Sequence, residues 1–90
     1  MKKFIIERSI PGAGEFSKAD LAEIAKKSNA VAFELGIPYH WIHTYITKDK
    51  FFCVHVAPDM DTVIKHAHMG CFPIDHIYEV EAMFDSSFEN

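Results

Sequence analysis

Short apolar runs along this chain predict four β-strands. The first run is brief, the second and third are rich in aromatic and β-branched residues, and the fourth alternates apolar and polar positions. Lys48 and Asp49 supply a turn between the second and third runs, so these two are expected to pair as a hairpin. The predicted strands cover residues 4–6, 39–47, 50–57 and 77–84.

Two further segments have the spacing of amphipathic helices. The first begins at Ser17, and Asp20 three residues later completes a variant of the capping box. Gly36 is placed where a helix commonly ends. The second helix is expected to begin at Asp59 and to stop at Gly70.

The order of elements is therefore β-α-β-β-α-β. Two helices cannot cover both faces of a four-stranded sheet, so both are expected to pack on one face. This is an α+β fold, a ferredoxin-like sandwich with an antiparallel sheet, forming one domain over residues 1–90. Its core spans about residues 3–84, and a loose tail follows. The other sheet face is left open for solvent, a second copy or a ligand.

Alternation assigns side chains to the open face. In residues 50–57, Phe52, Val54 and Val56 are typical of core positions. Phe51, Cys53 and His55 are therefore expected to point to the open face. The first strand adds Glu7 to the open face, and the fourth adds Glu79 because its even-numbered positions are apolar.

Residues 39–47 allow two registers. A strict two-residue hairpin loop turns Trp41 and His43 inward, whereas a bulge or a longer loop turns them outward. The outward register is favoured, because a buried His43 would need a hydrogen-bond partner. Tyr45 then joins them on the open face.

Imidazole, thiolate and carboxylate groups are ligands for nickel, zinc or copper. Cys53 and His55 share one strand face and His43 lies on the neighbouring strand, so a divalent-metal site is one hypothesis. Its candidate ligands are His43, His55, Cys53, Glu7 and His66, the last reaching from the second helix. The alternative is an aromatic dimer interface or a ligand pocket, formed by Trp41, Tyr45, Phe51 and Glu79.

Composition narrows the function classes. The formal net charge is -4 and the nine Lys and Arg residues are dispersed, which argues against nucleic-acid binding. No apolar run approaches the roughly 18 residues of a membrane span. No apolar leader stands at the N-terminus, so a cytoplasmic location with reduced Cys53 and Cys71 is expected. No catalytic triad or phosphate-binding loop is found; enzymatic activity is left open and a binding role is favoured.

Several segments together resemble the small ferredoxin-like "nickel-binding protein" family, across about residues 3–83. The segments that carry the resemblance are residues 4–14, 41–47, 53–54, 57–58, 66–67, 70, 72–73 and 79–80. The resemblance implies a ferredoxin-like α+β fold, a homodimer and nickel binding. Residues of the family type at matching positions are Glu7, Arg8, Trp41, His43, Tyr45, Cys53 and His66. His55 and His68 depart from the family pattern.

Two functions follow as hypotheses. The first is a homodimer that binds nickel, or another divalent transition metal, on the open sheet face. The second is a small-molecule-binding protein or enzyme of the dimeric α/β-barrel kind, similar in fold to small monooxygenases and isomerases. In the second, His43 or His55 would serve as the acid-base group of the aromatic pocket.

Overall fold

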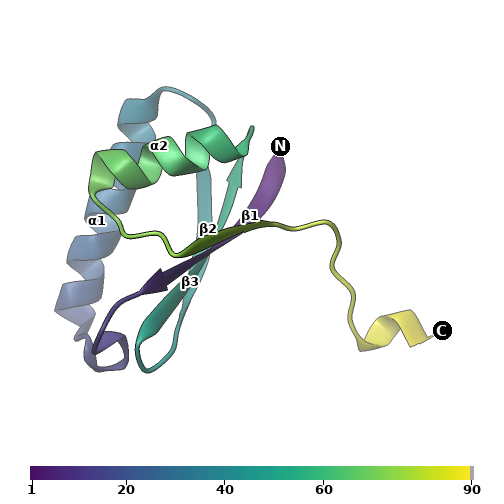
Figure 1. Ribbon diagram of the computed structural model, residues 1–90, viewed down its shortest axis with the longest axis horizontal. Coiled ribbons are helices and arrows are strands. Elements are labelled where there is room, and N and C mark those ends of the chain that lie inside the picture. Colours follow the sequence, from purple (N-terminus) through teal and green to yellow (C-terminus); the bar gives the residue numbers. More distant parts are fainter. Residues whose placement is uncertain (90) are drawn as a thin grey trace.

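The computed structural model describes residues 1–89 and contains the expected order of helices and strands (Figure 1). Two single-turn 3-10 helices, η1 and η2, are added. The elements are β1 (Lys2–Ser9), η1 (Ala13–Glu15), α1 (Lys18–Leu35), β2 (His40–Ile46), β3 (Lys50–Ala57), α2 (Met60–Gly70), β4 (His76–Glu79) and η2 (Ser86–Glu89).

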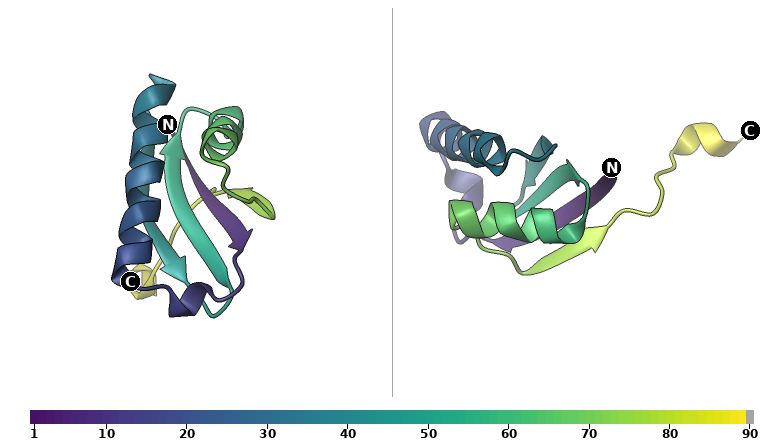
Figure 2. Two further views of the ribbon diagram at one scale, coloured as in Figure 1. Left: turned by 90° about the vertical axis from the view of Figure 1, so that its left-hand side faces the viewer. Right: turned by 90° about the horizontal axis from the view of Figure 1, so that it is seen from above.

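The four strands form one antiparallel sheet in the order β2-β3-β1-β4. Both helices lie on the same side of this sheet, as the two views of Figure 2 show. The predicted ferredoxin-like α+β fold is therefore confirmed. No helix in residues 1–89 has both the length and the apolar character needed to cross a bilayer.

The β4 strand ends earlier than the alternation predicted. It stops at Glu79, because its partner β1 begins at Lys2 and offers few further residues for pairing. The amide of Val80 still donates to the carbonyl of Lys3, at 2.8 Å. Residues 80–85 then leave the sheet, and Figure 1 shows this segment extending away from the domain to η2.

Local signals fixed the helix ends. Ser17 Oγ accepts from the Asp20 amide at 3.1 Å, and the Ser17 amide donates to Asp20 Oδ2 at 3.0 Å, which is the predicted reciprocal capping box. At the end of α2, Cys71 rather than Gly70 has the left-handed conformation (φ 56°). Gly70 has a different role, since a Cβ there would lie 2.3 Å from the Phe72 ring.

The pairing of β1 with β3 decides which side chains face the helices. Phe4 and Ile6 are fully buried under the helices, and they stand opposite His55 and Cys53. The prediction that Phe51, Cys53 and His55 point to the open face is therefore wrong. Both faces of β3 are apolar and largely buried, so alternation within that strand carries no information about its orientation.

A bulge at Ile42 changes the phase of β2. Trp41 stands opposite His55 and faces the helices, which contradicts the open-face prediction for Trp41. After the bulge, His43 stands opposite Val54, and Tyr45 opposite the outward Phe52. His43 and Tyr45 therefore lie on the open face.

The orientation predicted for β4 is also inverted. Ile77 stands opposite Ile6 and packs against the core, whereas Tyr78 stands opposite Ile5 on the open face. Glu79 lies on the helix side at the sheet edge, where its carboxylate is 3.7 Å from the ammonium of Lys2. Glu79 can lie on the helix side of the sheet because β4 is an edge strand and the side chain stays exposed to solvent.

Replacing Ser17 with Ala should lower the free energy of unfolding by about 1 kcal/mol, because the Asp20 amide loses its acceptor. Urea unfolding followed by far-ultraviolet circular dichroism measures this loss. Ser87→Ala is the matched control. Within residues 1–89, Ser87 bonds only to Asp85 in the exposed C-terminal segment, so its loss should cost less than about 0.5 kcal/mol. Equal losses in the two variants would contradict the role given to the capping box.

Candidate functional site

The structure divides the predicted site residues between the two sheet faces. Glu7, His43 and Tyr45 lie on the open face, and Glu79 lies at the sheet edge. The remaining residues face the helices: Trp41, Phe51, Cys53, His55 and His66. The five predicted metal ligands are thus not brought together. Within residues 1–89, no cluster of three His, Cys, Asp or Glu side chains has the geometry to hold a metal ion.

A small pocket of about 50 Å³ opens between the sheet and the helices. Strands β1, β2 and β3 supply most of its wall, and residues just after α2 close one side. Side chains of unlike chemistry meet there, among them Arg8, Trp41, Thr44, Cys53, His55 and Phe72. This pocket brings together four of the predicted site residues: Trp41, Phe51, Cys53 and His55.

Two buried histidines stand beside the pocket and are held by a tyrosine. His55 is 2% exposed, and its Nδ1 lies 2.5 Å from the hydroxyl of Tyr39. Burial raises the pKa of Tyr39, so its hydroxyl stays protonated. The hydroxyl therefore donates a hydrogen bond to Nδ1 of His55. The Tyr39 ring also stacks on His66, with 4.5 Å between ring centroids.

His66 is 1% exposed and has one polar group without a partner. Its Nε2 lies 3.1 Å from the carbonyl of Ser28, which can only accept, so Nε2 carries the proton. The neutral ring then leaves Nδ1 as a bare acceptor, and no donor among residues 1–89 reaches it. The sequence held a signal for this placement, because Val63, His66, Ala67 and Gly70 share one helix face and all are buried.

Both histidines are neutral at neutral pH. Burial, together with the nearby His66 and the Arg8 charge, lowers the pKa of His55 to about 3. Burial also lowers the pKa of His66; the Ser28 carbonyl opposes this shift, and the Arg8 charge adds to it. A positive guanidinium next to both rings makes this interior unfavourable for a divalent cation.

Arg8 is the residue whose burial the hydrophobic pattern of the chain missed. It is only 4% exposed, donates from Nη1 to the carbonyl of Pro73 at 2.7 Å, and places its guanidinium 5.5 Å from the centre of the Phe72 ring. A charge after an apolar run suggested the end of the first strand. The signal for burial was the period of two, since Arg8 continues the inward series of Phe4 and Ile6.

A chain of hydrogen bonds crosses the pocket wall from β2 to β3. Trp41 Nε1 donates to Thr44 Oγ1 at 2.9 Å, and Thr44 Oγ1 donates to Cys53 Sγ at 3.2 Å. The bulge at Ile42 makes this possible, because it puts Trp41 and Thr44 on the same face although they are three residues apart. The sulfur of Cys53 thereby has a fixed donor.

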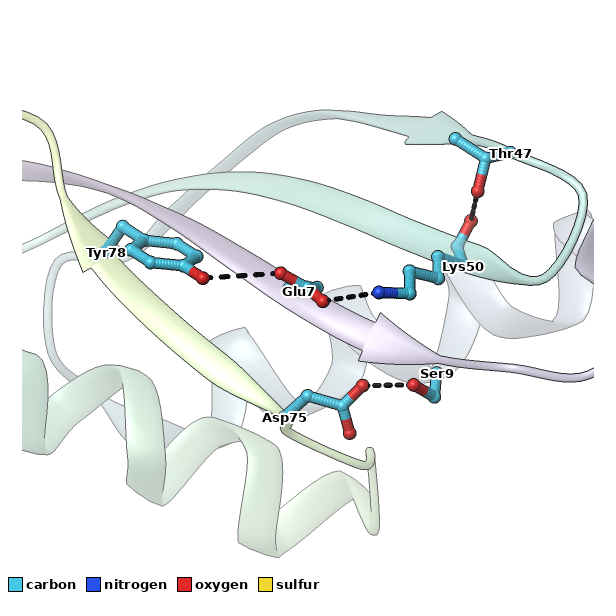
Figure 3. A network of polar contacts seen from close by, with 6 residues as sticks. All are labelled: Glu7, Ser9, Thr47, Lys50, Asp75 and Tyr78. Atoms are coloured by element: carbon cyan, nitrogen blue, oxygen red, sulfur yellow. Dashed lines mark hydrogen bonds and ion pairs between the residues drawn. The ribbon is translucent and has the colours of Figure 1, made fainter.

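The open face carries a separate polar network, drawn in Figure 3. Lys50 Nζ is 2.7 Å from one carboxylate oxygen of Glu7, and the Tyr78 hydroxyl donates to the other at 3.4 Å. The bond to Lys50 lowers the pKa of Glu7. Glu7 is therefore engaged as an ion-pair partner. Ser9 and Asp75 form a further hydrogen bond at the end of β1 (Figure 3).

His43 lies apart from that network, at a broad hollow of about 320 Å³ on the same face. Its ring meets Tyr45 edge-on, with 4.8 Å between centroids, and the side chain is exposed. Lys3, Ile5 and Met83 also line the hollow.

Comparisons with known proteins identify a family and a solved structure of similar fold. The model of a family described as "Nickel responsive protein SCO4226-like" matches residues 4–80. The crystal structure of SCO4226 from Streptomyces coelicolor A3(2) is similar, with a TM-score of 0.76 and 16% sequence identity over 91% of this chain and 99% of that chain. At that identity the likeness shows the fold alone. No curated protein matches the chain in sequence.

The free energy of unfolding should fall as pH drops from about 7 to about 5. His55 and His66 have lower pKa values in the fold than the ordinary 6.5, so the unfolded chain binds more protons in this range. Each histidine contributes up to about 1.4 kcal/mol per pH unit. Urea unfolding at several pH values measures the slope.

His55→Gln should flatten this dependence, whereas His68→Gln, on the exposed side of α2, should retain it. Measurements are kept above about pH 5, because carboxylates titrate at lower pH and would add their own pH dependence to the free energy of unfolding. A wild-type stability that stays constant from pH 7 to pH 5 would show that the two rings are not buried as neutral groups.

Proposed function

The chain belongs to the SCO4226-like nickel responsive protein family, and on that premise we propose that it binds Ni²⁺ as a homodimer, through exposed imidazoles of the open sheet face. The family match over residues 4–80 is the observation that carries the nickel assignment. The placement of the histidines supports the open face as the location.

The interior pocket is a poor alternative for the metal. Its Arg8 charge repels a dication, and both buried histidines already use one ring nitrogen, His55 toward Tyr39 and His66 toward Ser28. The residues present there do not fit a nickel ion. His55, His66 and Cys53 are therefore left out of the proposed ligand set.

Three exposed histidines lie on the open face instead. His40 and His43 belong to β2, and His76 begins β4 opposite Glu7. Neutral imidazole suits Ni²⁺. In residues 1–89 no three ligands meet within one chain, so a complete site needs ligands from a second copy. A two-fold dimer supplies them, because each copy presents the same patch to the other.

Exposed apolar side chains support a second copy as the occupant of this face. Tyr45 is 62% exposed and Tyr78 is 50% exposed, and both lie on the open sheet face. A 90-residue chain buries a smaller fraction of its surface than a larger domain does, so leaving large aromatic side chains exposed weakens an already modest core. The segment after β4 continues the patch: Met83 lines the open-face hollow, and Phe84 is 80% exposed. Dimerisation would bury these side chains.

His43→Ala should weaken nickel binding at least tenfold, because the side chain is a proposed ligand. Isothermal titration of protein purified without a tag or chelating resin measures the affinity, and sedimentation equilibrium measures the mass in the same samples. His68→Ala is the control, an exposed histidine on the helix side of the molecule, and its affinity should equal that of the wild type.

Two results would contradict the proposal. One is wild-type affinity in His43→Ala. The other is a wild-type chain that stays monomeric with nickel bound, because a single chain has no complete ligand set in its described residues.

A further inference from the structure

Arg8 presents a buried charge that has no counter-ion among residues 1–89. Two ion pairs occur in residues 1–89, Lys2 with Glu79 and Lys50 with Glu7, and neither includes Arg8. A buried arginine is ordinarily paired with a carboxylate or another anion, because an unpaired ion loses its hydration without compensation. A guanidinium has five N–H donors, and the described residues satisfy Arg8 through one hydrogen bond, to Pro73.

The pocket next to Arg8 also lacks negative charge. None of its lining residues is acidic. A second cation stands close by, since Lys27 Nζ lies 5.1 Å from the centre of the Phe72 ring. His55 and His66 carry no charge at neutral pH that would have to be balanced. The local field therefore favours an anion.

Part of the remaining wall of the pocket is apolar. Ile10, Trp41 and Phe51 contribute aliphatic and aromatic surface to the same pocket. A volume of about 50 Å³ is several times the roughly 10–15 Å³ that one water-sized group needs, so a small organic molecule has room there. A small anion with a short apolar body fits this combination of size, charge and surface.

We propose that this pocket binds a short-chain carboxylate, whose carboxylate group pairs with the guanidinium of Arg8 and whose alkyl part lies against Trp41 and Phe51. The planar fork of a guanidinium matches a carboxylate in a bidentate pair. This site is separate from the proposed nickel ligands, which lie on the other face of the sheet, so each can fail without the other.

Trp41 is the single tryptophan of the chain and lines the pocket, so its fluorescence reports on the site. Titration with butyrate in the presence of EDTA, at constant ionic strength, should give a saturable change. Butanol and butylamine have the same carbon chain without the negative charge and should give none. A matching saturable response to either, or no response to butyrate at millimolar concentrations, would overturn the proposal.

Arg8→Gln should weaken butyrate binding at least tenfold, because the charged partner is lost. Lys50→Gln is the matched control, since it removes a cation from the open face and should leave the affinity unchanged. Retained affinity in Arg8→Gln, or an equal loss in Lys50→Gln, would refute the role of Arg8.

The Nε–H resonance of Arg8 in the wild-type protein gives an independent readout, should Arg8→Gln fail to fold. In nitrogen-15 spectra this resonance should shift with butyrate and stay unchanged with butanol. Inorganic phosphate is the remaining comparison. If phosphate binds as tightly as butyrate, the pocket recognises oxyanions in general, and the assignment to a carboxylate with an apolar body is wrong.

Discussion

The register between β1 and β3 is the constraint on which the rest of this structure depends. It sets Phe4 opposite His55, Ile6 opposite Cys53 and Arg8 opposite Phe51. Because side chains alternate across a strand, a shift of one residue would exchange every one of these partners between the two faces. The buried Phe4 and Ile6 fix β1, and β1 in turn fixes β3.

This register places polar groups where a small fold would otherwise have aliphatic core. His55, His66 and Arg8 are all buried, but the histidines and the arginine are accommodated in different ways. The two histidines lose their charge and hydrogen-bond to Tyr39 and Ser28. A guanidinium is a permanent cation, so Arg8 places a positive charge beside an open pocket. An arrangement that costs stability in this way is typical of a site with a function.

The element order and the caps of α1 could be predicted from sequence because their signals are local. Ser17 and Asp20 lie in one turn, and the αL residue Gly36 immediately follows α1. The faces of β3 could not be predicted, because residues 51–57 are apolar on both sides and only the pairing with β1 separates them. The bulge at Ile42 has no local signature either, since it depends on how β2 meets β3. The resemblance to the nickel-binding family pointed to Arg8, which the hydrophobic pattern alone had passed over.

The central claim is that Cys53 faces the helices while the other cysteine, Cys71, is exposed. Labelling of the native protein with a bulky maleimide, followed by peptide mass spectrometry, tests this most directly. The structure predicts that Cys71 reacts rapidly and that Cys53 reacts only after unfolding. Labelling of Cys53 at the rate of Cys71 in the native protein would place β3 in the opposite orientation and contradict the account.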